Sequence, residues 1–195
     1  MFVAGDSSVS VLDARSGALV QNVAVGGPPL GLAVDQALGR IFLTSIDESV
    51  SPNRSVLVLD ARSGQYLQTF PVPGNPDLMV VDEHAQRAIA FARGGVRGEL
   101  SVLDARSGAV LHTARVDETP SNLIVDDRTG HLFVIRAGPQ NKLGQYIGAG
   151  HVTLLDERTG TLLRSIRVGR APGPAVVDTR TERVLVVNEG DGTVS

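Results

Sequence analysis

The sequence predicts an all-β fold made of repeated units of short antiparallel strands. The phrase Val-Leu-Asp-Ala-Arg-Ser-Gly occurs at residues 11–17, 58–64 and 102–108, and a related phrase, Leu-Leu-Asp-Glu-Arg-Thr-Gly, occupies residues 154–160. The apolar runs between these phrases are too short for helices and are bounded by Gly, Pro, Asp and Ser. Short strands in units of about 40 to 50 residues are typical of β-propeller blades, each a four-stranded antiparallel sheet.

Two aspartates mark each repeat. From the aspartate of the repeated phrase to a second aspartate, which ends an apolar run, the distance is 22 residues in all four copies. The pairs are Asp13 and Asp35, Asp60 and Asp82, Asp104 and Asp126, and Asp156 and Asp178. A proline stands six residues before each second aspartate. The distance from a second aspartate to the next first one varies, so all the length variation falls in one segment.

The elements of one repeat follow in order. Strand one is the run before the second aspartate (residues 30–34), and a turn at residues 35–39 leads into strand two (residues 40–44). After the variable segment, strand three ends in Val-Leu-Asp, and the Ala-Arg-Ser-Gly turn leads into strand four, as at residues 18–25 or 109–116. The other copies of strand two are predicted at residues 87–92, 131–136 and 183–188.

The turn residues suit this arrangement. An aspartate can accept hydrogen bonds from the backbone amides that follow it, and glycine adopts a positive φ without strain. Glycine closes the first turn at Gly39 and Gly130, whereas Gln86 and Glu182 stand at the same position in the other copies. Because the aspartates recur at fixed turn positions, we interpret them as structural and not as catalytic carboxylates.

The repeats predict one domain spanning residues 1–195. Its blades are expected at residues 1–25 (partial), 26–72, 73–116, 117–168 and 169–195 (partial). Residues 2–10 align with residues 186–195, so the chain starts and stops at the same phase of the repeat. Either it is a piece of a longer array of blades, an open arc with exposed edges, or its last strands complete the first blade in a four-bladed ring. We expect the open arc.

These motifs resemble the YVTN-repeat β-propeller family, which includes YncE-like proteins. The matching features are the phrase ending in Val-Leu-Asp (residues 9–13 and 100–104), the Arg-Ser-Gly turn, and a Val-Gly-x-x-Pro link (residues 25–29 and 168–172). The motif Tyr-Val-Thr-Asn itself is not intact, and the absence of tryptophan disfavours kinship with Trp-Asp repeats. The resemblance implies binding or assembly more often than catalysis, and a location outside the cytoplasm, although no signal-peptide pattern is visible.

Composition excludes several functions. The net charge of −3 argues against a nucleic-acid partner. With no cysteine, the chain has no disulfide, thiolate metal site or cysteine nucleophile. No apolar run approaches the length of a transmembrane segment. No phosphate-binding or nucleophile motif has the required context, so we expect no cofactor.

The variable segments and the proline-bearing links are expected at the same end of each blade. Binding residues concentrate on loops carried by a rigid scaffold, so we place the binding face there. The candidates in the variable segments are Asp47, Glu48, Arg54, Arg93, Arg97, Asn141 and Tyr146. The candidates at the start of strand one, near the mouth of a central channel, are Asp77, Ser121 and Asn122.

We therefore expect a non-catalytic binding scaffold whose partner is a protein, a glycan or a small ligand. Open edge strands would also permit self-association. The alternative is part of a propeller enzyme, such as a sugar lactonase or the propeller subunit of a quinoprotein dehydrogenase. Such an enzyme would hold a metal or cofactor at the channel mouth.

Overall fold

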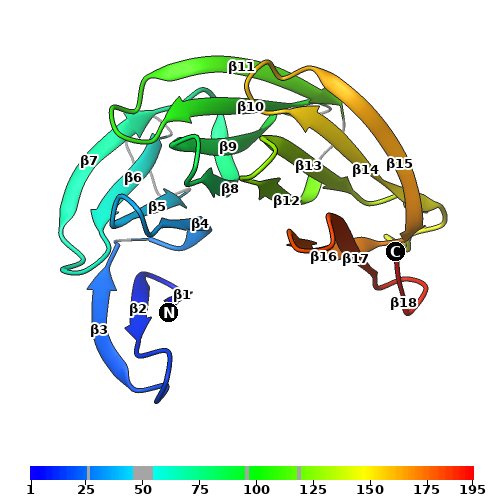
Figure 1. The fold of residues 1–195 in the computed structure, drawn as a ribbon. Helices are drawn as coiled ribbons and strands as arrows, with labels where there is room; N and C mark the ends of the chain where they lie inside the picture. The colour runs from blue at the N-terminus through cyan, green and yellow to red at the C-terminus, as the bar shows by residue number, and fades with distance from the viewer. Residues whose placement is uncertain (26, 46–54, 95–96, 118–119) are drawn as a thin grey trace. The chain divides into compact units, whose positions relative to one another are not determined.

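The structure is a computed structural model that describes residues 1–195 except 26, 46–54, 95–96 and 118–119, and without the side chains of residues 45, 94, 97 and 117 (Figure 1). The described residues form strands and turns and contain no helix.

The strands form five antiparallel sheets, which follow one another along the chain and which we call blades one to five. Blade one contains β1 (Phe2–Ala4), β2 (Ser8–Leu12) and β3 (Leu19–Ala24). Blade two contains β4 (Pro29–Asp35), β5 (Arg40–Ser45), β6 (Ser55–Asp60) and β7 (Tyr66–Pro71). Blade three contains β8 (Asn75–Asp82), β9 (Arg87–Gly94), β10 (Arg97–Asp104) and β11 (Val110–Asp117). Blade four contains β12 (Pro120–Asp126), β13 (His131–Arg136), β14 (Ala149–Asp156) and β15 (Leu162–Arg170). Blade five contains β16 (Pro172–Asp178), β17 (Arg183–Asn188) and β18 (Thr193–Val194).

The chain divides into two compact units. The first comprises residues 1–94 and 99–111, and the second comprises residues 95–98 and 112–195. Within each unit, the buried apolar side chains lie between neighbouring blades.

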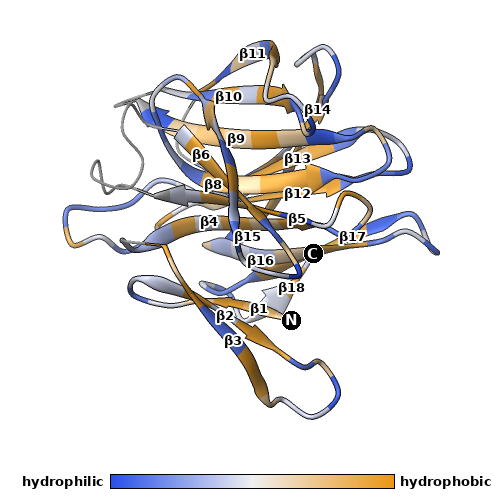
Figure 2. Cartoon of the chain, turned by 90° about the vertical axis from the view of Figure 1, so that its left-hand side faces the viewer, coloured by the Kyte–Doolittle hydropathy of each residue, from blue (hydrophilic) through white to orange (hydrophobic). Residues whose placement is uncertain are grey.

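Central strands bury both of their faces. In β5, Ile41 and Leu43 belong to a cluster between blades one and two, whereas Phe42 belongs to a cluster between blades two and three. This follows from the two-residue period of a strand, which sends successive side chains to opposite faces. The second unit has its own cluster between blades four and five, formed by Ile135, Val152 and Val186. Figure 2 shows the apolar residues concentrated in strands such as β9 and β12, with polar residues in the turns.

The strand registers separate two ends of each blade, as blade four illustrates. Asp126, His131 and Asp156 are in register across β12, β13 and β14, which places the turns at residues 127–130 and 157–161 together at one end, the turn end. Pro120 lies at the opposite end of β12, where the β13–β14 loop also lies. We call this opposite end, with its two–three loops and inter-blade links, the loop end.

The first aspartate of each repeat caps its own turn. The Asp104 carboxylate accepts hydrogen bonds from the backbone N–H of Arg106 (3.1 Å), the backbone N–H of Ser107 (2.7 Å) and the hydroxyl of Ser107 (2.7 Å). These hydrogen bonds, with that of the Ser107 amide foremost, hold the pKa of Asp104 below its ordinary value. Asp13, Asp60 and Asp156 cap their turns in the same way. The predicted structural role of these aspartates therefore agrees with the geometry.

The turn between strands one and two requires a positive φ in every blade that has this turn. Gly39 and Gly130 supply it, with φ values of 63° and 67°. Gln86 and Glu182 adopt 55° and 56° at the equivalent positions, as the alignment of the repeats indicates. For these non-glycine residues the conformation is strained, and hydrogen bonding of the turn must offset that strain.

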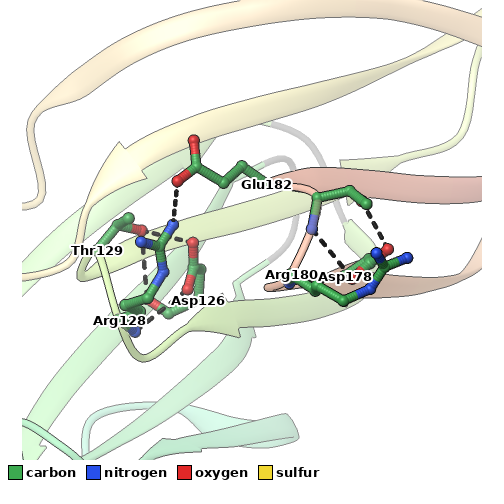
Figure 3. A network of polar contacts seen from close by, with 7 residues as sticks. Asp126, Arg128, Thr129, Asp178, Arg180 and Glu182 are labelled. Atoms are coloured by element: carbon green, nitrogen blue, oxygen red, sulfur yellow. Dashed lines mark hydrogen bonds and ion pairs between the residues drawn. The ribbon is translucent and has the colours of Figure 1, made fainter.

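Polar contacts also link the turn ends of neighbouring blades. In the second unit, Arg128 Nη2 donates to Glu182 Oε1 at 2.7 Å, joining the first turns of blades four and five (Figure 3). Asp126 and Asp178 cap those two turns through hydroxyl and backbone donors. Glu182 raises the pKa of Arg128, but both side chains are exposed, so solvent screening keeps the energy of this ion pair small.

The glycine of the repeated phrase packs against the outermost strand of the preceding blade. A Cβ atom on Gly64 would lie 2.3 Å from Cγ2 of Val23, and one on Gly108 would lie 2.1 Å from Cδ1 of Phe70. Both distances are too short for non-bonded atoms, so these positions exclude any side chain. Both glycines also have a positive φ, of 67° and 74°.

The same contact recurs in the second unit, where a Cβ atom on Gly160 would lie 2.8 Å from Cβ of Ala114. The glycine of blade one differs: at Gly17 a Cβ atom would meet no atom within 4 Å. Its φ of 70° is nevertheless like those of the other turns. At Gly17, glycine is therefore needed only for the positive φ, whereas at Gly64, Gly108 and Gly160 it is also needed for close packing.

A side-chain hydrogen bond accompanies each of these inter-blade contacts. Gln21 Nε2 donates to the carbonyl of Ser63 at 2.8 Å, and Gln68 Nε2 donates to the carbonyl of Arg106 at 3.0 Å. His112 Nε2 lies 2.6 Å from the carbonyl of Glu157 and must be the donor there, because a carbonyl only accepts. Gln21, Gln68 and His112 stand at the same position of their repeats.

The outermost strands begin with two exposed apolar residues. Where the registers are described, the second residue of each pair lies in a bulge: Val20, Leu67 and Leu163. A bulge interrupts the ladder at a sheet edge and opposes pairing with another chain. Self-association through edge strands stays a prediction.

Gly108→Ala should destabilise the protein more than Gly17→Ala. Both substitutions place alanine at a positive φ, which costs about 1–2 kcal/mol. Only Gly108→Ala also drives a methyl group into the Phe70 ring, at a further cost of about 1–3 kcal/mol. Urea denaturation followed by circular dichroism measures both losses. Equal losses would show that the contact with Phe70 does not constrain the turn.

Acid should weaken the turn caps. Because the pKa values of Asp60 and Asp104 are lowered in the folded state, their contribution to stability is complete above about pH 4, the ordinary pKa of aspartate. It is lost as the pH falls through the folded pKa. Asp60→Asn/Asp104→Asn keeps an acceptor oxygen but cannot titrate. Its free energy of unfolding, measured by denaturation at several pH values, should therefore fall less steeply below about pH 5 than that of the wild type. Identical slopes would contradict the role of the ionised carboxylates.

Candidate functional site

At the loop end, the innermost strands share a β-bulge directly after a proline. The register shifts between Pro29 and Gly31 in β4 and between Pro76 and Leu78 in β8. The same shift follows the proline that begins β12. The residue inside the bulge opposes no residue of the partner strand, so its side chain leaves the normal alternation. These bulge residues are Leu30, Asp77 and Ser121.

In blades two, three and four the bulge is therefore a constant backbone feature that carries a different side chain in each blade. The sequence located the prolines and proposed Asp77 and Ser121 as candidates, but it did not reveal the bulge. Leu30, the equivalent residue of blade two, was missed as a candidate. Aligning the residues that follow each proline would have found it.

An open pocket of about 550 Å³ lies at the loop end between blades two and three. Its lining combines apolar and polar side chains: Leu30, Asn75, Asp77, Leu78 and Arg93. All five belong to the first unit, and four of them lie on β8 and β9.

Close backbone contact between β4 and β8 adjoins the two leucines of this pocket. A Cβ atom on Gly31 would lie 2.8 Å from Oγ1 of Thr44 and 3.1 Å from the backbone nitrogen of Met79. Gly31 also donates its N–H to Thr44 Oγ1 at 2.7 Å, in a buried hydrogen bond. Glycine at this position lets the two strands approach, and this brings Leu30 beside Leu78 on the lining.

Two of the candidate residues, Asp77 and Arg93, form an ion pair. Arg93 Nε donates to Asp77 Oδ2. Asn75 of β8 and Arg93 of β9 are register partners. Asp77, two residues after Asn75, lies in the bulge and has no register partner on β9. The Asp77 side chain is 14% exposed and that of Arg93 is 59% exposed, so a mostly buried carboxylate holds a mostly exposed guanidinium. Separated by 16 residues in the sequence, the two are brought together by the hairpin.

Ser121 and Asn122 form local hydrogen bonds within the second unit. The Ser121 hydroxyl lies 3.2 Å from the carbonyl of Ile135 and 2.8 Å from the carbonyl of Pro172. Asn122 Oδ1 accepts from the adjacent backbone N–H of Leu123 at 2.8 Å. Ser121 thus ties blade four to blade five, and a binding role for Ser121 and Asn122 stays a prediction.

The candidate Asn141 organises the β13–β14 loop, residues 137–148. Its side-chain oxygen accepts from the backbone N–H of Leu143 (2.9 Å) and of Gln145 (3.0 Å). Its side-chain nitrogen donates to Gln145 Oε1 at 2.9 Å. Backbone hydrogen bonds between Asn141 and Gln145 and between Ile147 and Pro139 complete the turn. Although the loop is rich in glycine, it is internally hydrogen-bonded.

The tip of this loop is apolar and exposed. Leu143 is 83% exposed and Ile147 is 62% exposed, whereas Tyr146 is 37% exposed and forms a β-bridge with Gln140. Glycine is required at the neck of the loop, where a Cβ atom on Gly138 would lie 2.3 Å from the carbonyl oxygen of Gly148. A tight neck and an ordered turn therefore present an apolar tip to solvent.

Four other candidates cannot be placed. Asp47, Glu48 and Arg54 lie outside the described residues, and of Arg97 only the backbone, at the start of β10, is described. Among the residues that the structure describes, no three His, Cys, Asp or Glu side chains gather as metal ligands. In the same part of the chain, no helix is long and apolar enough to span a membrane.

The comparisons with known proteins establish the fold. No known sequence family matches the chain, and no curated protein matches it. The WD40 domain of Neurospora crassa Pan2 has a TM-score of 0.73 at 13% identity, over 97% of this chain and 58% of that one. A chain of hydrazine synthase from Kuenenia stuttgartiensis has a TM-score of 0.72 at 18% identity, over 92% of this chain and 49% of that one. BamB from Moraxella catarrhalis has a TM-score of 0.60 at 15% identity, over 98% of this chain and 56% of that one.

These similarities confirm the predicted fold class: the chain is an all-β protein built of β-propeller blades. At such low identity the likeness to a WD40 domain is one of fold. The chain spans about half the length of the structures it matches.

Proposed function

We propose that the chain is a non-catalytic binding scaffold of the YVTN-repeat type, and that it engages its partner through the loop end of the blades. On this proposal its five sheets act as blades of one repeat domain. Fixed turns form the turn end, whereas the loop end carries the side chains that differ from blade to blade.

The observation that carries the proposal is the β13–β14 loop. An exposed apolar side chain has no folding role, but on a pre-ordered loop it can bind a partner at a low cost in conformational entropy. Leu143 and Ile147 are such side chains, and Asn141 fixes the backbone between its own position and Gln145. Tyr146, an aromatic residue with a polar end, is of a type enriched at the centres of protein interfaces.

The ionisable side chains at the turn end support a structural role for that end. Asp104, Asp126 and Asp178 hold their carboxylates against the amides and hydroxyls of their own turns. Groups that are saturated in this way are poorly suited to proton transfer or metal binding.

A photo-crosslinking experiment tests the loop end as the binding surface. Tyr146 is replaced by p-benzoylphenylalanine, and the protein is irradiated in extracts of the cells that produce it. We expect a discrete adduct from position 146, and we expect Leu143→Ser/Ile147→Ser to abolish it. The matched control carries the same photoreactive group at Arg158, in the exposed turn between β14 and β15.

The control position should give no discrete adduct. Adducts from position 158 but not from position 146 would move the binding surface to the turn end. An adduct at 146 that survives the double serine substitution would show that the apolar tip does not bind the partner.

A further inference from the structure

The pocket between blades two and three combines a positioned guanidinium with two leucines. Arg93 has five N–H donors, and the one on Nε is used by Asp77. The remaining four, on the two Nη atoms, form no hydrogen bond to any described residue. The Arg93 side chain is 59% exposed and lines the pocket, so these donors are accessible to a ligand there.

Asp77 acts here as a positioning residue. Its carboxylate is mostly buried and accepts the Nε–H of Arg93 through Oδ2, which restrains the position of the guanidinium. A planar guanidinium restrained in this way presents its free edge for a bidentate pair with a second carboxylate. Asn75, the register partner of Arg93, contributes an amide to the same lining and adds a further donor.

The apolar part of the lining comes from neighbouring blades. Leu30 stands in the bulge of β4, and Leu78 follows the bulge of β8. Leu30 is 45% exposed and lines the same pocket as Asp77 and Arg93. A ligand that covers both leucines would gain from burial of their apolar surface.

We propose that this pocket binds a small ligand that carries a carboxylate next to an apolar group. The carboxylate pairs with the Nη groups of Arg93, and the apolar group lies against Leu30 and Leu78. The volume of about 550 Å³ falls within the range of about 300–1,000 Å³ that is usual for small-molecule sites. The inference rests on the proposed function in that it places a ligand at the loop end.

The position within the repeat supports a specific site. The bulge has the same backbone form in blades two, three and four, but it carries leucine, aspartate and serine. Among these three residues, only Asp77 can orient an arginine, whereas Ser121 bonds to backbone carbonyls. The bulge position, which three blades share, therefore holds an ion-paired carboxylate only in blade three.

Titration with hexanoate and with hexanamide, followed by protein NMR chemical shifts, tests the proposal. We expect saturable binding of hexanoate and at least tenfold weaker binding of hexanamide. Arg93→Gln should weaken hexanoate binding at least tenfold, whereas Arg164→Gln, which removes an exposed arginine of β15, should leave it unchanged. Arg93→Lys keeps the charge but loses the bidentate geometry, and its affinity should be intermediate.

The apolar contact has its own test. In the wild type, affinity should rise from butanoate to octanoate, and Leu30→Ser should flatten this rise. Comparison of N-acetyl-leucyl-leucine, with its free C-terminal carboxylate, and octanoate distinguishes a peptide carboxylate from a free fatty acid, according to which binds more tightly. Either result supports the carboxylate site.

Equal binding of acid and amide, no binding of any acid, or an unchanged affinity in folded Arg93→Gln would overturn the proposal. Thermal unfolding of each variant establishes that it is folded. If no carboxylate binds while position 146 still gives its adduct, the pocket assignment fails and the proposed function stands. If carboxylates bind while position 146 gives no adduct, the pocket assignment stands and the apolar tip is excluded.

Discussion

In blades two to four, the contact between the glycine of the repeated turn and the outermost strand of the preceding blade is the constraint on which the structure depends. A single blade cannot bury both of its apolar faces, so it must pack on a neighbour. Gly108 approaches Phe70 so closely that no Cβ atom fits, and the side chain of Gln68 adds a hydrogen bond to the carbonyl of Arg106. Turn and strand therefore set the distance between these blades.

With the turn end fixed in this way, the loop end is free to vary. In blades two to four, the proline-bearing link brings the chain back to the same bulge, but the residue in that bulge is Leu30 in blade two and Asp77 in blade three. The insertions also fall at the loop end, and in blade four the insertion is ordered by Asn141. The binding proposals follow from this division. One end holds the blades in register, while the other displays side chains on a backbone whose position is already determined.

Much of the fold was predictable because its signals are local. Apolar runs and turn residues located the strands, and Gly39 and Gly130 were expected to adopt a positive φ, as they do. What the sequence could not supply were contacts between segments distant along the chain. The packing of Gly108 on Phe70, the hydrogen bond from His112 to blade four, and the pairing of Asp77 with Arg93 all depend on tertiary geometry. Asn141 was identified as a binding candidate, and its hydrogen bonds show that it also orders its own loop.

The most direct test of this account is a double-mutant cycle between Phe70→Ala and Gly108→Ala. If steric contact between ring and turn limits residue 108, removing the ring should relieve it. Gly108→Ala should then cost at least about 1 kcal/mol less in the Phe70→Ala background than in the wild type, measured as free energy of unfolding. Losses that add to within about 0.5 kcal/mol would contradict the account, because they would show that the turn and the neighbouring strand do not depend on each other.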